Sequence, residues 1–180
     1  FYGITKDELD VILTKVNTKV TSDEMKDWYN GYHFDGEMIY NLWSTLSSLL
    51  HGGKLGYYWK DTLNSSKMLM DQVLLFDNTQ EYLHKLLLGQ MISRKNINKP
   101  IKLENIHENF HRVLLFGGYF NPTSAFCESN CYIHPWNLSI PNKEIKDVLA
   151  ESVSKWVASK LNISITDYQT FTAQFTNLKL

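Results

Sequence analysis

Two groups of residues have the types and spacing that a metal centre needs. In the first, His107 and His111 lie four residues apart, and Glu108 follows the first histidine. Residues four apart share one face of a helix, so both imidazoles could bind one zinc ion while Glu108 polarises a metal-bound water. Arg112 departs from the usual zinc-protease helix, and no Gly-x-x-His continuation follows. The alternatives here are a zinc-dependent hydrolase and a pair of exposed histidines.

The second group has the pattern Cys127-x3-Cys131-x2-His134. Thiolates and imidazoles are zinc ligands, but structural zinc sites usually have the tighter Cys-x2-Cys spacing. Two free thiols, or a strained disulfide between them, are the alternatives. We expect no metal or other cofactor in this chain, and zinc at either group is the competing hypothesis.

Nucleotide and nuclease chemistry have no complete motif in the sequence. The phosphate-binding loop Gly-x4-Gly-Lys-[Ser/Thr] is absent, because Gly52-Gly53-Lys54-Leu55 lacks both its spacing and the hydroxyl that would hold magnesium. Glu144-Ile145-Lys146 has the Glu-x-Lys pattern of a metal-dependent nuclease, but it falls at an expected helix start and not on a strand. We therefore expect that the chain alone is not an enzyme.

Charge is unevenly divided along the chain. Residues 1–83 hold 7 lysines and 12 acidic residues, a net charge of −5, whereas residues 84–180 hold 11 basic and 7 acidic residues, a net charge of +4. The stretch from residue 84 to residue 102 contains no acid. It could contact the phosphates of a nucleic acid, and its alternative role is a solvated face. Its basic residues are Lys85, Arg94, Lys95, Lys99 and Lys102.

Capping signals and a 3.6-residue periodicity of apolar residues predict a mainly helical chain. The clearest signals are the capping box Thr5-Lys6-Asp7-Glu8 and the cap residues Asn41 and Asn142. We expect helices after the Thr5 cap, from Ser22 to Asn30, from Leu42 to His51, from an Asn64 or Ser65 cap to Phe76, from the Thr79 cap to Gly89, from Leu103 to Phe116 and from Lys143 to Leu161.

A β-hairpin is expected in the second half of the chain. Strand-like runs at residues 119–120 and 131–140 flank the turn residues Glu128-Ser129-Asn130, and Pro141 stops the second run. A helix, a hairpin and another helix resemble a winged-helix unit. The predicted fold class is mainly α with one β-hairpin. It comprises a helical lid-like subdomain at residues 1–92, a winged-helix-like subdomain at 101–161 and a packed C-terminal tail at 162–180.

The densest aromatic stretch runs from Trp28 to Ser44. Gly31 can take the left-handed conformation that ends a helix, Asp35-Gly36 favours a turn, and Asn41 can cap a helix that begins at Leu42. The stretch therefore predicts a helix end, a tight turn and a helix start, with the rings packed around the turn. The alternative is a ligand pocket walled by aromatic rings.

An ordered series of short motifs extends from this stretch over about residues 3–160. It comprises Gly3-Ile4-Thr5 with Glu8, Trp28-Tyr29-Asn30-Gly31-Tyr32 with Phe34, Tyr40-Asn41, Trp43-Ser44, Tyr58-Trp59 with Thr62, Gly118-Tyr119, and Ile140-Pro141-Asn142 with Glu144. In this series the chain resembles the AAA-ATPase-like proteins that carry a PD-(D/E)XK nuclease-type domain at their C-terminal end. Two departures from the family pattern are visible: Leu42 replaces its usual Pro, and Phe120-Asn121 replaces its usual Leu-Thr.

The resemblance implies that the chain is a fragment, with a P-loop core upstream of Phe1 and the nuclease residues beyond Leu180. It implies a non-catalytic linking or recognition segment, with ATP and magnesium bound elsewhere in the parent protein. The partners would be the flanking ATPase-like and nuclease-type domains and either a nucleic acid or another protein, and the Trp28–Ser44 turn would pack against the nucleotide core. The expected structural interface comprises Trp28, Tyr29, Asn30, Gly31, Tyr32, Phe34, Tyr40, Asn41, Trp43, Ser44, Tyr58, Trp59, Gly118, Tyr119, Pro141 and Asn142.

A third hypothesis, beside the linking segment and the zinc hydrolase, is a protein-interaction scaffold of an effector or toxin. The two cysteines do not make a disulfide framework, and no apolar run reaches membrane-spanning length. The composition therefore predicts an intracellular, cytoplasmic protein without a membrane partner.

Overall fold

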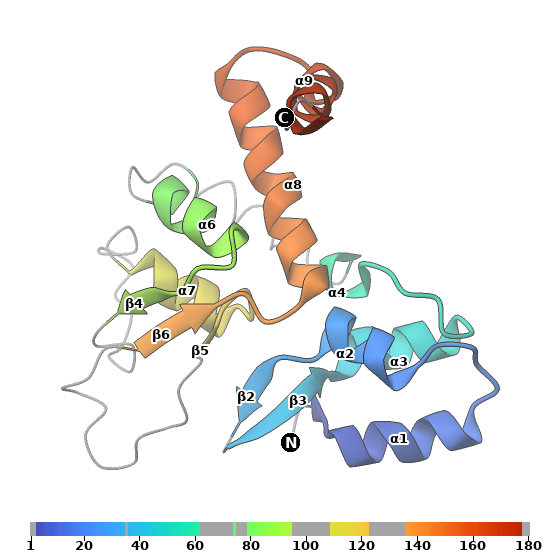
Figure 1. The fold of residues 1–180 in the computed structure, drawn as a ribbon. Coiled ribbons are helices and arrows are strands. Elements are labelled where there is room, and N and C mark those ends of the chain that lie inside the picture. Colours follow the sequence, from blue (N-terminus) through green and yellow to red (C-terminus); the bar gives the residue numbers. More distant parts are fainter. Residues whose placement is uncertain are drawn as a thin grey trace.

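The computed structural model describes residues 3–34, 36–61, 74, 79–94, 109–122 and 136–177. Over these residues the chain is mainly helical with small antiparallel sheets, which confirms the predicted fold class (Figure 1). The helices are α1 (Lys6–Lys15), α2 (Ser22–Tyr29), α3 (Leu42–Leu50), α4 (Tyr58–Asp61), α6 (Thr79–Leu87), α7 (Phe110–Phe116), α8 (Lys143–Lys160) and α9 (Ile165–Asn177). The strands are β1 (Gly3–Ile4), β2 (Tyr32–Phe34), β3 (Glu37–Asn41), β4 (Ile92–Arg94), β5 (Asn121–Pro122) and β6 (Trp136–Ser139).

The N-terminal half encloses the first of two hydrophobic cores. Helix α1 begins with the predicted capping box, in which the Thr5 hydroxyl accepts from the Glu8 N–H and the Glu8 carboxylate accepts from the Thr5 N–H. Helix α2 begins with a second box, made by Thr21 and Glu24. These helices and α3 contact the antiparallel sheet β1-β3-β2. The buried side chains of this N-terminal core are Ile4, Leu9, Met25, Tyr29, Tyr40 and Leu49.

A β-hairpin lies within the Trp28–Ser44 stretch, where a direct helix–turn–helix was expected. Helix α2 ends before Gly31, and Asn41 caps α3 as predicted. Between them β2 and β3 pair with Phe34 opposite Glu37, so a two-residue connection that contains Gly36, with a φ of 82°, joins the strands. Asp-Gly between alternating apolar residues is a strong hairpin signal, because the glycine accepts a positive φ. The expected helix end, turn and helix start are therefore present, but the two strands that flank the turn were not predicted.

The C-terminal half encloses the second core. Its antiparallel sheet has the order β4-β6-β5, with Ile92 opposite Leu138 and Asn121 opposite Ser139. The described elements follow in the order α6, β4, α7, β5, β6, α8, and β6 lies between the other two strands, an arrangement typical of winged-helix units. The buried side chains of this C-terminal core are Trp59, Leu74, Leu83, Leu86, Ile92, Phe110, Leu114, Tyr119, Phe120, Leu138, Ile145, Val148 and Leu149.

The chain passes from one core to the other at α4. Tyr58 packs against the N-terminal core, whereas the next residue, Trp59, is buried in the C-terminal core. Leu83 of α6 and Ile92 of β4 also belong to the C-terminal core. The packing thus changes core at Trp59, well before residues 93–100, which separate the first two predicted subdomains. The predicted subdomain boundaries stay a prediction.

Helix α8 packs its first half into the C-terminal core through Ile145, Val148 and Leu149, and α9 folds back against its far end (Figure 1). The Asn142 side chain caps α8 as predicted, since its Oδ1 accepts from the Ile145 N–H at 3.1 Å. None of the helices in the described ranges is long and apolar enough to span a membrane. The predicted hairpin turn at 128–130, the helix expected to end at Phe76 and the segment 103–108 lie outside the described residues.

Replacing Thr21 with alanine removes the hydroxyl acceptor of the α2 capping box. Loss of such a cap costs about 1 kcal/mol, so we expect the free energy of unfolding, measured by urea titration, to fall by about that amount. Thr14→Ala is the control, because the Thr14 hydroxyl donates to the Val11 carbonyl within α1 and alanine favours a helix interior. Equal losses in the two variants would contradict a stabilising role for the cap.

Candidate functional site

Most residues of the expected structural interface come together where the two cores meet. We call this region the junction and define it by four segments, residues 30–33, 57–60, 118–121 and 141–144. Direct hydrogen bonds join segments that are 85 to 112 residues apart in the sequence. Part of the motif series that carries the resemblance is therefore gathered at one place in the fold.

The first contact of the junction is a close approach between two backbones. Gly31 has a φ of 104°, and a Cβ atom at this position would lie 2.0 Å from the Pro141 carbonyl oxygen. Next to it, the Asn142 Nδ2 donates to the Asn30 carbonyl at 2.9 Å. The same Asn142 side chain caps α8 through its Oδ1, so one residue both starts α8 and holds the end of α2.

The second contact joins β2 to Gly118 and to Asn121, the first residue of β5. The Tyr32 hydroxyl donates to the Gly118 carbonyl at 3.1 Å, and the His33 N–H donates to the Asn121 Oδ1 at 2.9 Å. Asn121 is buried and belongs to one of the two departures from the pattern of the resembled family. The Asn121 side-chain oxygen thus accepts the hydrogen bond of an N–H group on the edge strand β2. Without Asn121, this N–H would lack a partner in a region shielded from water.

The third contact is made by a fully buried carboxylate. Glu144 in the first turn of α8 is 0% exposed, and its Oε1 accepts from the Trp59 N–H at 2.7 Å. The positive end of the helix dipole favours a negative charge at this position. The Trp59 ring then meets Tyr119 edge to face, with ring centroids 4.8 Å apart. Glu144 thus holds α4 against α8 through a hydrogen bond from the Trp59 backbone to its Oε1. This is a structural role.

The negative charge of Glu144 raises the pKa values of nearby tyrosines. Burial raises the pKa of Tyr32 above its ordinary value, and the Glu144 charge raises it further. Burial, with a smaller contribution from Glu144, likewise raises the pKa of Tyr29 to about 12. Both phenols therefore stay neutral near pH 7 and remain hydrogen-bond donors, Tyr32 to Gly118 and Tyr29 to the Gly56 carbonyl at 3.0 Å.

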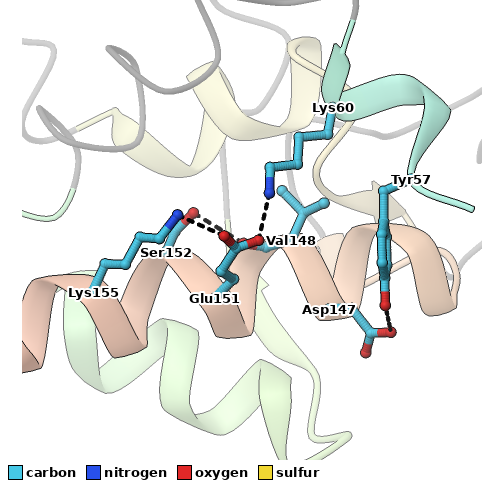
Figure 2. Close-up of polar contacts among 7 residues, drawn as sticks. All are labelled: Tyr57, Lys60, Asp147, Val148, Glu151, Ser152 and Lys155. Atoms are coloured by element: carbon cyan, nitrogen blue, oxygen red, sulfur yellow. Dashed lines mark hydrogen bonds and ion pairs between the residues drawn. The ribbon is translucent and has the colours of Figure 1, made fainter. Parts of the chain in front are cut away.

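A polar rim continues the junction along α8, as Figure 2 shows. The Tyr57 hydroxyl donates to Asp147 at 3.0 Å, and Lys60 pairs with Glu151 at 2.6 Å. Glu144, Asp147 and Glu151 are spaced three and four residues apart, so all three carboxylates face the 57–60 segment from one side of α8. The sequence analysis missed this rim. The acidic spacing on α8 was readable, but nothing in the 57–60 segment identified Tyr57 and Lys60 as its partners.

Other members of the expected interface lie outside the junction. Tyr40 and Ser44 are buried in the N-terminal half, whereas Phe34 and Trp43 are 53% and 56% exposed. Trp28 contacts the rings of Tyr29 and Tyr57 at centroid distances of 6.1 and 5.5 Å, and the Lys143 ammonium lies over the Trp28 ring at 4.9 Å. The alternative of a ligand pocket walled by rings has no support in these contacts, since the rings pack on one another.

The candidate metal ligands fall almost entirely outside the described residues. His107, Cys127, Cys131 and His134 belong to that group, and within the described ranges no cluster of three or more potential ligands occurs. His111 is described, and it is 6% exposed in α7 with its ring edge to face with Phe110. The alternative that both histidines are exposed is therefore wrong for His111.

The basic stretch is also described only in part. Lys85 pairs with Glu81 at 2.5 Å on the surface of α6. Arg94 lies in β4, and only its backbone is described. Lys95, Lys99 and Lys102 lie outside the described residues, so phosphate binding by this stretch stays a prediction.

Comparisons with known proteins do not add to these observations. A scan of protein-family models, a search of curated proteins and a search of solved structures each found no match for this chain. The resemblance to AAA-ATPase-like proteins therefore stays a hypothesis that rests on the motif series.

Gly31→Ala should destabilise the contact between the end of α2 and the loop before α8. The unfavourable φ costs about 1–3 kcal/mol, and the clash with Pro141 adds to it, so we expect a loss of more than about 3 kcal/mol in urea titration. Gly36→Ala is the matched control, because Gly36 also has a positive φ but nothing lies within 4 Å of an added Cβ. We expect about 1–2 kcal/mol there, and equal losses would contradict the close approach.

The rim around Glu151 should respond to acid. The Lys155 ammonium, and after it Lys60, holds the pKa of Glu151 below its ordinary value. Because the folded pKa is the lower one, these pairs stabilise the folded protein above the unfolded pKa of about 4.3 and stop doing so as the pH falls through the folded pKa. Glu151→Gln should therefore reduce the unfolding free energy at pH 7 by less than about 1 kcal/mol and weaken its dependence on pH between about 5 and 3.

Urea titrations at pH 7, 5 and 3 check this expectation, and 1 M salt provides the control because it screens exposed ion pairs. The difference between wild type and Glu151→Gln should shrink in salt at pH 7. A difference that is largest at pH 3 would contradict the assignment.

Proposed function

We propose that this chain is a non-catalytic linking segment of an AAA-ATPase-like protein that carries a PD-(D/E)XK nuclease-type domain. The observation that supports this proposal is where the motif residues lie. Asn30, Gly31 and Tyr32 meet Gly118, Pro141 and Asn142 across the junction, through backbone contacts and hydrogen bonds. Residues used in this way hold two structural units together, and they do not present reactive groups to a substrate.

Such a junction can transmit movement between domains that flank the chain. The N-terminal core and α8 are tied by contacts that leave little freedom, namely a backbone approach that only glycine permits and a buried carboxylate on a backbone N–H. A displacement of the N-terminal core would therefore be passed to α8 as a nearly rigid movement. In this proposal the N-terminal half follows the ATPase-like core, and α8 with α9 leads to the nuclease-type domain.

The recognition partner that we favour for this segment is protein. In DNA-binding winged-helix units the helix before the hairpin enters the major groove and carries cationic and polar side chains. Helix α7 holds that place in the order of elements, but Arg112 is 4% exposed with its Nη1 bonded to Asn109, whereas Phe116 is 68% exposed. The residue of α7 that is most exposed is thus apolar, which suits a protein partner better than phosphates.

The parent protein provides the test. We expect its gene to encode a Gly-x4-Gly-Lys-[Ser/Thr] loop before Phe1 and an Asp with Glu-x-Lys after Leu180. In that protein, nuclease activity should change when ATP is added, and Gly31→Ala should abolish this change without altering nuclease activity in the absence of ATP.

Gly36→Ala is the control and should keep the response to ATP, because its added Cβ meets nothing within 4 Å. A gene that starts near Phe1 and stops near Leu180 would refute the proposal and favour the interaction scaffold. A Gly31→Ala protein that is folded by circular dichroism and still responds to ATP would refute the coupling role of the junction.

A further inference from the structure

Asn30 and Gly31 form the only Asn-Gly dipeptide in the sequence. In such a pair the backbone nitrogen of the glycine can attack the side-chain carbonyl carbon of the asparagine, because glycine has no Cβ to hinder the approach. This reaction converts the asparagine to an acid without an enzyme or a cofactor. Both residues lie in the junction, so their reactivity depends on how the junction holds them.

The closed junction holds the reacting atoms close together but in the wrong orientation. The Gly31 N–H donates to the Asn30 Oδ1 at 2.8 Å, so its hydrogen points at the amide that the nitrogen would attack. Attack on Cγ requires the nitrogen to lose this hydrogen and to approach from above the plane of the amide. The ψ of Asn30 is −173°. At this angle the Cβ and the Gly31 nitrogen are staggered about the Cα–C bond, whereas the five-membered ring of the product requires them to be nearly eclipsed.

Contacts on both sides of the Asn30–Gly31 peptide oppose the rotation that would close this ring. The Asn30 carbonyl accepts from the Asn142 Nδ2 at 2.9 Å, and rotation about Cα–C would turn it away from this donor. A Cβ atom at Gly31 would lie 2.0 Å from the Pro141 carbonyl oxygen, so the backbone there has little room to move. Asn30 is only 6% exposed, which limits access of water. The pair is therefore protected while the junction is closed.

We propose that Asn30 is a modification site that becomes reactive when the junction opens. The Gly31 nitrogen gives up its proton and forms a bond to the Asn30 Cγ. The Cγ–Nδ2 bond breaks, and the side-chain nitrogen takes up a proton and leaves as ammonia. Water then breaks one of the two ring C–N bonds of the cyclic imide. Cleavage at Cγ gives aspartate, and cleavage at the backbone carbonyl carbon gives isoaspartate. No electrons are transferred, and water is the only co-reactant.

Either product hinders renewed closure of the junction. In isoaspartate the chain continues through Cγ, so the carbonyl group that accepted from Asn142 becomes part of a free carboxylate. The backbone also gains one carbon atom before Gly31, which displaces the glycine from a position where the Pro141 carbonyl leaves no room. In aspartate the backbone is unchanged, but a charged group replaces an amide that is 6% exposed, which is unfavourable. The modification thus makes an opening of the junction permanent.

The rate of deamidation tests the proposal. The 180-residue chain is incubated at pH 7 with and without denaturing urea. The peptide that contains residue 30 is followed by mass spectrometry and by methylation with an isoaspartyl methyltransferase. Because the slow reaction of an open form follows the population of that form, we expect the folded protein to react about a hundred-fold more slowly than the unfolded protein, or slower still.

Variants that weaken the junction should accelerate the reaction under folding conditions. Asn142→Ser should react about ten-fold faster than wild type, which corresponds to about 1.4 kcal/mol of junction stability. Serine can cap α8, but it has no amide to donate to the Asn30 carbonyl. Tyr32→Phe removes the hydroxyl that donates to Gly118, and it is a second variant with the same expected direction.

Thr5→Ala is the matched control. It removes a cap from α1, outside the four segments of the junction, so the rate at Asn30 should stay within about two-fold of wild type. Circular dichroism establishes that each variant is folded before its rate is measured.

Hydrogen exchange tests whether the opening is permanent. The His33 N–H donates to Asn121 across the junction. In the deamidated protein, separated by ion exchange, this amide hydrogen should exchange about ten-fold faster than in the unmodified protein.

Three results would overturn the proposal. Equal rates in folded and unfolded wild type would show that the junction does not protect Asn30. Rates in Asn142→Ser and Tyr32→Phe that match Thr5→Ala would show that opening of the junction does not control the reaction. Unchanged exchange at His33 after deamidation would show that the junction closes again. None of these results bears on the linking function, which the gene of the parent protein tests separately.

Discussion

The approach of two backbones at Gly31 and Pro141 is the constraint on which the arrangement of the two halves depends. Any side chain at position 31 would overlap the Pro141 carbonyl, so only glycine lets the end of α2 touch the loop before α8. That contact brings Asn142 within 2.9 Å of the Asn30 carbonyl. The residue that starts α8 then also holds the end of α2, and the direction of α8 relative to the N-terminal core follows from backbone geometry.

The polar contacts along α8 differ in how much they contribute to the free energy of folding. A hydrogen bond from a backbone N–H to a buried carboxylate is worth about 1.5–3 kcal/mol, whereas an exposed ion pair is worth less than about 1 kcal/mol. The bond between Trp59 and Glu144 therefore contributes more to the position of α4 than the pair between Lys60 and Glu151. The exposed contacts add little stability at the edge of the junction. Salt or acid can therefore weaken them without breaking the buried hydrogen bond between Trp59 and Glu144.

Local features of the fold could be predicted from sequence, and contacts between distant segments could not. Caps at Thr5, Asn41 and Asn142 were predicted, because a cap bonds to a backbone N–H three residues away. The β2–β3 hairpin was missed although Asp-Gly was noticed, because the aromatic residues beside it were interpreted as helix ends. The motif series contained many of the residues that lie at the junction, but contacts such as that of Tyr32 with Gly118 were not predicted, because they depend on how two cores pack and leave no periodic signal.

The two departures from the pattern of the resembled family have different structural consequences. Leu42 is the first residue of α3, where proline is favoured because the N–H at that position needs no partner in the helix. Leucine there still begins the helix under the Asn41 cap, and its side chain is exposed, as is that of Trp43. Asn121 lies in the junction and accepts from the His33 N–H. The first departure thus lies on the exposed side of α3, and the second supplies a hydrogen bond inside the junction.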